Sequence, residues 1–398
     1  MTPPDRARLS RAQLNRALLA RQHLLERRRG PALDVVRHLV GLQAQNAWSP
    51  YVGLWSRVDG FRHAELGDAF WDRTVARIAV MRGTIHLVTA PDALLLPGLT
   101  MPLYARDLRA NAAHAAGLRT LDLTELTTAA RALLEEEPRV TTDLGRLLAQ
   151  RWPDVAPGTL AYGARGTLPL VQVPPRGVWG RSGATTWTTA SAWFGADQVA
   201  AAPDLTDPDV LAREQERLLL RYLTAFGPAS VADAQNWSGL AGLRAVADRL
   251  GDALVRFEAD PAPGGVRPRE LLDVPGGLLP DADVPAPVRF LPDYDNVLLG
   301  HADRTRIISE EHRRLLASPN GVIASTFLLD GHVAGTWTVT RERLASTGRS
   351  RRELATVTVR PFEAITAPDR RAVLAEADGV VRLMADDAAE HRAVLVEE

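Results

Sequence analysis

Apolar residues near the start of the chain recur at helical spacing. Ser10 and Gln13 fit a capping box, and leucines follow them in a helical stripe. Further helices are predicted over 33–40 and 62–71. Ser49, which a proline follows, is typical of an N-cap with proline at the first helical position. The first part of the chain is therefore predicted to be mainly helical.

The period then changes to two. Residues 75–89, VARIAVMRGTIHLVT, alternate between apolar and polar about a central Gly83, which predicts a β-hairpin. Helices followed by a two-stranded wing are typical of a winged-helix domain, and we assign 1–105 to a first such unit.

Two more sets of helices followed by strands come next. Helices are predicted over 124–137, 142–151 and 158–166 before a strand–loop–strand segment at 169–189, and over 208–225, 231–238 and 241–251 before another at 253–274. The pattern R-x-L-x4-P-x4-D begins at Arg131 and again at Arg221, at the same place in each set, which indicates a duplication. The sequence thus predicts three tandem winged-helix units, at 1–105, 120–200 and 205–280.

The last part of the chain has a different pattern. Asp330-Gly331, between two alternating runs, predicts a hairpin with a type I′ turn. A strand is predicted over 353–362 and a helix over 367–384. We expect a β-rich domain at 285–398 that this C-terminal helix closes, and an α+β fold class for the whole protein.

The composition is ordinary for a globular protein, with 46% hydrophobic and 24% charged residues. No uncharged apolar run reaches the roughly 18 residues of a spanning helix, and the N-terminus lacks the apolar segment of a signal peptide. We therefore expect no membrane association and a cytoplasmic location.

Two residue types are missing from the sequence. There is no cysteine, which excludes disulfides, thiolate metal sites and a cysteine nucleophile. There is also no lysine, so all 47 basic residues are arginine and a Schiff base at a lysine side chain is excluded.

The net charge is −1, but the arginines are unevenly distributed. Residues 1–40 hold nine arginines against three acidic residues, and 341–352 hold five against one. Arg82, Thr84 and His86 share one strand parity and would form a polar row on the first wing. These features fit either phosphate binding or ordinary solvated surface.

Other polar clusters suggest chemistry only weakly. His301 and Asp303 could begin a two-histidine, one-carboxylate metal site, although a polar loop is the simpler interpretation. Asp293 and Asp295 could serve acid–base catalysis, although such Pro/Asp clusters more often form turns. The nucleotide-binding and hydrolase motifs G-x-x-x-x-G-K-[ST], G-x-G-x-x-G and G-x-S-x-G are absent. We expect no metal site.

Two glutamines, Gln43 and Gln45, stand where the helical pattern predicts core. If the helix continues beyond Val40, their side chains would cap its last carbonyls. Alternatively, they face a cleft and act on a ligand.

Five sequence blocks resemble those of the AlkZ/YcaQ-like family of winged-helix DNA glycosylases. They are GLQAQ, MRGTIHLV, FLPDYDNVLLGHADR, VAGTWTVTR and VRPFEAI, in that order over nearly the whole chain. The resemblance implies three winged helices and a β-domain in a C shape around duplex DNA. It also implies excision of N7-alkylated purines, in one branch including bulky adducts and interstrand crosslinks. The family's catalytic motif, Gln-x-Gln or Gln-x-Asp, falls on Gln43 and Gln45, with Ala44 smaller than the usual middle residue.

A carboxamide suits such a substrate. It does not titrate near neutral pH and is a poor general base. An N7-alkylguanine is cationic, however, so its glycosidic bond breaks to release a neutral base and little leaving-group activation is needed. What remains is to place a water under C1′ and to stabilise an oxocarbenium-like centre, which carbonyl dipoles can do.

The sequence therefore predicts a monofunctional DNA glycosylase, since without lysine we expect no β-elimination. We expect a monomer that binds double-stranded DNA with alkylated purines and needs no cofactor. Contacts to DNA are expected from the N-terminal helix, the first wing, the basic loop and a cleft-lining segment at 290–306, with the named contacts Arg82, His86, Arg349, Arg351 and Arg352. The alternatives are a non-catalytic winged-helix transcriptional regulator, or a relative that binds modified DNA or an alkylating metabolite without hydrolysis.

Overall fold

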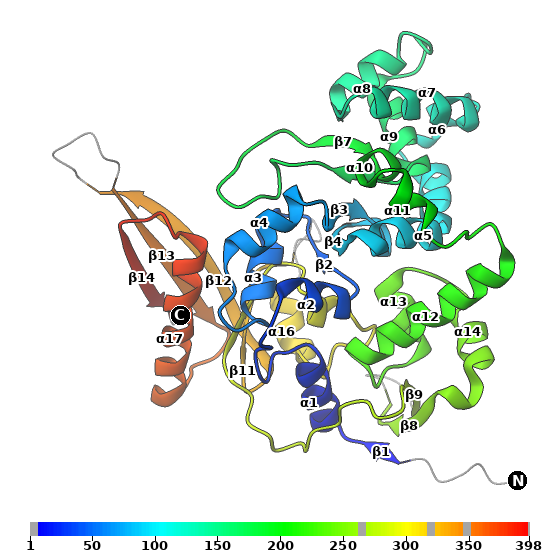
Figure 1. Cartoon of the computed structure of the whole chain (residues 1–398). Coiled ribbons are helices and arrows are strands. Elements are labelled where there is room, and N and C mark those ends of the chain that lie inside the picture. Colours follow the sequence, from blue (N-terminus) through cyan, green and yellow to red (C-terminus); the bar gives the residue numbers. More distant parts are fainter. Residues whose placement is uncertain (1–6, 262–267, 317–322, 345–351, 397–398) are drawn as a thin grey trace, which may run out of the picture.

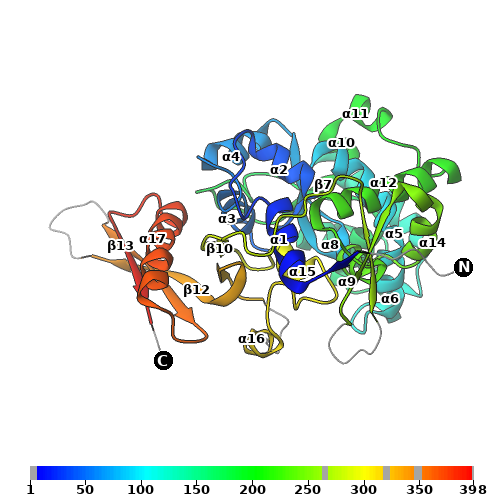
Figure 2. The ribbon, with the colours of Figure 1, turned by 90° about the horizontal axis from the view of Figure 1, so that it is seen from below.

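Helices and mostly antiparallel strands alternate along the chain in an α+β arrangement (Figure 1). The computed structural model describes residues 7–261, 268–316, 323–344 and 352–396. In both views α17 and β13 lie at the opposite end of the molecule from α5 and α14 (Figures 1 and 2). No helix in those ranges is long and apolar enough to cross a membrane.

The first set of elements contains the predicted hairpin, which a long helix that the sequence did not predict, α5, follows. The elements are β1 (Arg8–Leu9), α1 (Arg11–Arg21), α2 (Ala32–His38), β2 (Leu42–Gln43), α3 (Ser49–Trp55), α4 (His63–Trp71), β3 (Val75–Ala79), the 3₁₀ turn η1 (Met81–Gly83), β4 (Ile85–Thr89) and α5 (Ala90–Ala110). The capping box at Ser10 and Gln13 is confirmed. Ser49 is the first helical residue of α3 and not its N-cap, because its hydroxyl donates instead to Asp293.

The chain leaves α2 as a strand, so the expectation of a continued helix at the glutamines is wrong. Val40 and Gly41 have φ angles of 58° and 108°, which break the helical path. A Cβ on Gly41 would lie 2.8 Å from the Leu87 carbonyl oxygen, so glycine lets β2 approach β4 this closely.

The second and third sets also contain the predicted antiparallel hairpins, and two short helices, α10 and α11, follow that of the second set. The second contains α6 (Ala115–Leu118), α7 (Leu123–Glu136), β5 (Arg139–Val140), α8 (Thr141–Leu148), α9 (Pro157–Thr167), β6 (Leu170–Gln172), β7 (Thr186–Thr189), α10 (Ala190–Phe194) and α11 (Ala196–Ala200). The third contains α12 (Pro208–Phe226), α13 (Val231–Ser238), α14 (Leu243–Leu250), the 3₁₀ turn η2 (Gly251–Ala253), β8 (Val255–Ala259) and β9 (Arg269–Asp273). The duplicated motif begins on the long helix of each set, at Arg131 in α7 and Arg221 in α12.

Strand pairing joins these sets to one another. The first two hairpins form one six-stranded sheet in the order β2-β4-β3-β6-β7-β5, because β3 pairs with β6. The N-terminal β1 pairs in parallel with β8 of the third set. From α1, Arg21 donates to both carboxylate oxygens of Asp273 at 2.6 and 2.8 Å, so the N-terminal helix is fastened to the third hairpin.

The C-terminal part is a sheet with a helix, as predicted. It contains β10 (Arg289–Leu291), α15 (Asn296–Leu299), α16 (Glu310–Leu315), β11 (Thr326–Leu329), β12 (His332–Arg343), β13 (Glu353–Pro361), α17 (Ala367–Met384) and β14 (Glu390–Leu395). Asp330 and Gly331 have φ angles of 43° and 77°, as a type I′ turn requires. After α17 the chain adds β14 parallel to β13, a strand the sequence did not predict.

Candidate active site around the two glutamines

The backbone of residues 43–44, which belongs to the segment with the two glutamines, is hydrogen-bonded to β4 and to a side chain of β3. Gln43 pairs with His86 in the β2–β4 ladder, and the Ala44 amide donates to the Ile85 carbonyl at 2.7 Å. The Ala44 carbonyl accepts from Nη2 of Arg77 at 2.7 Å. Ala44 is fully buried, so its methyl group packs in the core. The segment therefore has one fixed backbone position.

The two glutamine side chains lie in different environments. Gln43 is only 6% exposed, and its Oε1 accepts from Nη2 of Arg82 at 2.7 Å. Gln45 is exposed in the bend after β2 and forms no side-chain hydrogen bond with any described residue. Neither side chain caps a helix, so the capping alternative is wrong. Gln45 is free to bind a ligand.

Arg82 and His86 lie beside Gln43, but not as a solvent-facing row. Burial is the main cause that lowers the pKa of Arg82 to about 10, with Arg304 adding to it. His86 is 1% exposed, and burial followed by Arg82 lowers its pKa to about 3. The expected exposed polar row is therefore wrong for His86, whose buried side chain does not face solvent as a DNA contact would.

Arg77 is a site residue that sequence reasoning missed. It lies on β3, is 1% exposed, and its pKa is lowered to about 10, chiefly by burial. Its Nε and Nη1 atoms have no partner among the described residues. The position of Arg77 between apolar residues of a predicted strand could have indicated that its side chain is buried.

The bend after the glutamines forms hydrogen bonds with the segment after β10, in the C-terminal part of the chain. Asn46 and Ser49 both donate to the carboxylate of Asp293, and burial raises the pKa of Asp293. Asp295 accepts from the Arg57 guanidinium at 2.7 and 2.9 Å and also caps α15. Both carboxylates of the pair considered for acid–base catalysis thus have structural partners.

The segment 290–306 is largely buried beside this site. His301 is 1% exposed with its Nε2 at 3.0 Å from the Phe226 carbonyl oxygen, and Asp303 pairs with Arg269 at 2.8 Å. Within the described ranges, no cluster of three or more His, Cys, Asp or Glu side chains could hold a metal ion.

The basic stretch at the N-terminus is largely neutralised in three dimensions. The ion pairs are Arg8–Asp260, Arg16–Asp330, Arg21–Asp273, Arg27–Glu376, Arg28–Asp34, Arg29–Asp59 and Arg37–Asp34. The count of arginines along the sequence therefore overestimated the positive charge of this surface. The ion pairs do not support the N-terminal helix as a basic contact to DNA. The structure places Arg352 on the surface, paired with Glu390 at 3.1 Å, whereas Arg349 and Arg351 lie outside the described residues.

A cleft of about 760 Å³ opens beside the glutamine bend. Its lining comes from the bend and α3, the β6–β7 loop and the C-terminal part, and comprises Ala47, Trp48, Tyr51, Gly177, Val178, Trp179, Gly180, Arg181, Arg341, Met384, Asp386 and Asp387. Trp179 stacks on His63 with ring centroids 4.1 Å apart, and its Nε1 donates to Asp386 at 3.1 Å. The volume lies within the roughly 300–1,000 Å³ typical of ligand sites.

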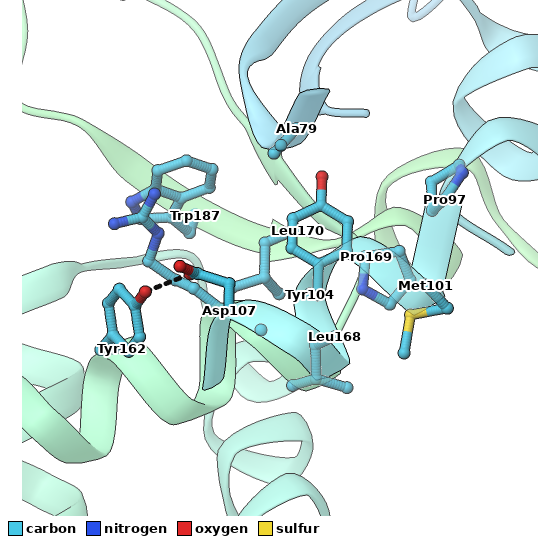
Figure 3. A pocket seen from close by; sticks show the side chains of 13 residues that line it. Ala79, Pro97, Met101, Tyr104, Asp107, Tyr162, Leu168, Pro169, Leu170 and Trp187 are labelled. Atoms are coloured by element: carbon cyan, nitrogen blue, oxygen red, sulfur yellow. Dashed lines mark hydrogen bonds between the residues drawn. The ribbon is translucent and has the colours of Figure 1, made fainter. Parts of the chain in front are cut away.

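A second pocket, between α5, α9 and the six-stranded sheet, is much smaller, at about 80 Å³ (Figure 3). Tyr104 crosses it, and the Tyr162 hydroxyl donates to Asp107. Burial raises the pKa of Tyr162 to about 12. The volume is far below that of a usual ligand site, so we take this pocket to be a packing feature.

Comparison with known proteins identifies the family. The model of the family described as DNA glycosylase AlkZ-like matches residues 36–383. The chain is 27% identical over 352 residues to the interstrand DNA cross-link repair glycosylase of Streptomyces sahachiroi, covering 83% of this chain and 88% of that protein. The solved structure of the Streptomyces sahachiroi DNA glycosylase AlkZ matches with a TM-score of 0.76 at 21% identity, over 98% of this chain and 100% of that one, and shows the same fold.

The matched class of protein is DNA glycosylase, and the chain is an enzyme of this class. It belongs to the DNA glycosylase AlkZ-like family, as the resemblance indicated. The family therefore favours a catalytic role over a transcriptional regulator.

Proposed function

We propose that this DNA glycosylase hydrolyses the N-glycosidic bond of N7-alkylated purines in double-stranded DNA, with Gln43 and Gln45 as catalytic residues. The observation that carries the proposal is that Gln45 is exposed and without a side-chain partner among the described residues, in the bend whose next residues, Ala47 and Trp48, line a large cleft. An unpaired polar side chain on a fixed backbone is suited to orient a water or a substrate.

The reaction needs no strong base. The C1′–N9 bond breaks, and its electron pair neutralises the positive charge of the alkylated purine. A water adds to C1′ and releases a proton to solvent, which leaves an abasic sugar. The carbonyl oxygen of Gln45 would orient this water and stabilise the sugar cation. Since the chain has no lysine, the abasic strand stays intact and the enzyme is monofunctional.

The three sets of helices with hairpins support three tandem winged-helix units, at 1–105, 120–200 and 205–280, followed by the β-rich domain. We assign the whole a C shape around duplex DNA and a monomeric state. The parallel β1–β8 pair adds a contact between the first and third units.

The proposal is tested by incubating the enzyme with a duplex that carries one N7-methylguanine. We expect the free base to be released and the strand to break at that position only after alkali treatment. Strand breakage without alkali would contradict monofunctional action, and no base release would contradict the proposed substrate.

The cleft lined by Ala47 and Trp48 of the same bend supports a further role on bulky adducts. The relative's name assigns that protein to interstrand cross-link repair. Three aromatic side chains, Trp48, Tyr51 and Trp179, line the cleft. Tyr51 is 1% exposed and packs against Trp179, so Trp48 and Trp179 offer the flat apolar surfaces to a planar substituent on the purine.

Replacing Trp179 with alanine should therefore affect bulky substrates most. Stacking on an aromatic side chain contributes about 1–3 kcal/mol, so we expect excision of N7-benzylguanine to fall about tenfold more than excision of N7-methylguanine. Single-turnover rates on the two duplexes measure this ratio. Trp193→Ala is the matched control, because Trp193 packs on Arg73 outside the cleft. An equal loss on both substrates would contradict the role of the cleft.

DNA contacts from the basic loop are a second expectation. Charge reversal at Arg349, Arg351 and Arg352 should weaken duplex binding and reduce its salt dependence, by a slope of about 0.9 for each phosphate that the loop no longer neutralises. Titrations at several salt concentrations measure both quantities. The same change at three exposed arginines of α17, namely Arg370, Arg371 and Arg382, serves as a control. Unchanged affinity and slope would remove the loop from the binding surface.

A further inference from the structure

Arg82 is held in an unusual backbone conformation at the point where three parts of the chain meet. In η1 its φ is 54°, a left-handed value that non-glycine residues rarely adopt. A Cβ on Gly239, just after α13, would lie 3.1 Å from the Cα of Arg82, so the turn packs closely on that helix end. Nη1 of Arg82 donates to the Trp237 carbonyl in the last turn of α13, where the helix dipole favours a cation.

The contact with Gln43 decides how its amide is oriented. Nη2 of Arg82 lies 2.7 Å from Oε1 of Gln43, and a guanidinium can only donate. The oxygen of the amide must therefore face Arg82, and the NH₂ group must point away from it. That nitrogen forms no hydrogen bond with the described residues and is not one of their fully buried unpaired atoms, so the 6% of Gln43 that is exposed includes it.

His86 is compatible with this orientation of the Gln43 amide, because its ring does not repel the Arg82 guanidinium. Its Nδ1 lies 2.9 Å from the Thr84 carbonyl oxygen, which can only accept, so Nδ1 carries the proton. Nε2 then presents a lone pair 3.5 Å from Nη2 of Arg82. Burial keeps the ring neutral, and a neutral ring does not repel the guanidinium.

We infer that Arg82 is a positioning residue that fixes the Gln43 carboxamide with its oxygen inward and its NH₂ group toward DNA. Gln43 then acts as a hydrogen-bond donor, and its partner is an acceptor atom of the departing purine, whose electron density rises as the bond breaks. Gln45, without such an anchor, supplies the accepting oxygen. This inference rests on the proposed function and divides the two glutamines by role.

Glutamate substitutions distinguish donor from acceptor, because glutamate keeps the oxygens and removes the NH₂ group. In single-turnover excision of N7-methylguanine, we expect Gln43→Glu to lose as much activity as Gln43→Ala, about 10²-fold. We expect Gln45→Glu to lose less than about tenfold, since the acceptor remains. Gln150→Glu, an exposed surface change, is the control.

The role of Arg82 is tested through its coupling to Gln43. Arg82→Met should slow excision, and combining it with Gln43→Ala should add no further loss, whereas its effect should multiply with that of Gln45→Ala. Arg82→Lys should restore part of the rate, because an ammonium can also donate to Oε1. Thermal melting of each variant separates this coupling from a loss of folding.

Two results would overturn the inference while the proposed function stands. Near-normal excision by Gln43→Glu would show that an oxygen is the working atom. Multiplying losses from Arg82→Met and Gln43→Ala would show that Arg82 acts independently of Gln43. Failure of the wild-type enzyme to release N7-methylguanine would instead overturn the proposed function and the inference together.

Discussion

Replacing Gln45 with alanine is expected to slow excision of N7-methylguanine by about 10²–10³, the effect of removing one electrostatic stabiliser from an active site. The side chain is exposed and forms no hydrogen bond with described residues, so its removal should leave the fold intact. Single-turnover kinetics and thermal melting of the same variant measure the two effects. Gln150→Ala, at another exposed glutamine, should change neither.

A structural role for Gln45 would give the opposite result. Loss of a structural side-chain contact would lower the free energy of unfolding by about 1 kcal/mol and leave catalysis unchanged. A lowered melting temperature with normal excision would therefore contradict the catalytic assignment of Gln45.

The second large effect is expected on stability, at the buried pair of Arg57 and Asp295. Their side chains are 0% and 1% exposed, and the pair joins the end of α3 to the segment after β10. Asp295→Ala would leave the guanidinium buried without its countercharge, which lowers the free energy of unfolding by about 3–5 kcal/mol. Urea denaturation followed by circular dichroism measures this loss.

The matched control for this variant is Asp378→Ala on α17. Asp378 pairs with Arg382 at 2.8 Å, but both side chains are about half exposed. A surface pair contributes at most about 1 kcal/mol, so the control should change stability little. Equal effects of the two variants would contradict a special role for the buried pair.

Local patterns predicted most of the elements. The capping box at Ser10, the hairpin around Gly83, the turn at Asp330-Gly331 and the helix over 367–384 all depend on residues close in sequence, and all are confirmed. Short-range periodicity and turn chemistry carry this information.

Pairings between distant segments could not be read from the sequence. Three strand pairings depend on the register between separate segments: β3 with β6, β1 with β8, and β14 with β13. β2 is only two residues long, too short for an alternating pattern, so its segment resembled the end of a helix.

The candidate site was predicted in part. The family resemblance singled out Gln43 and Gln45, but their different environments depend on Arg82, which only the fold brings to Gln43. The clustered arginines near the N-terminus predicted a basic surface that the structure does not show. The acidic partners of Arg21 and Arg27 lie more than 200 residues away in sequence, so the local charge count missed them. Charge counted along the chain therefore says little about charge on the folded surface.

The most direct test of the central claim is single-turnover excision of N7-methylguanine by the Gln43→Ala, Gln45→Ala double variant, alongside the wild-type enzyme. We expect the wild type to release the base. We expect the variant to release none above the uncatalysed rate, with the affinity for undamaged duplex unchanged. Its melting temperature should fall only by the loss of the Arg82–Gln43 hydrogen bond, about 1–3 kcal/mol, so the variant still folds. Excision by the double variant at the wild-type rate would contradict the account.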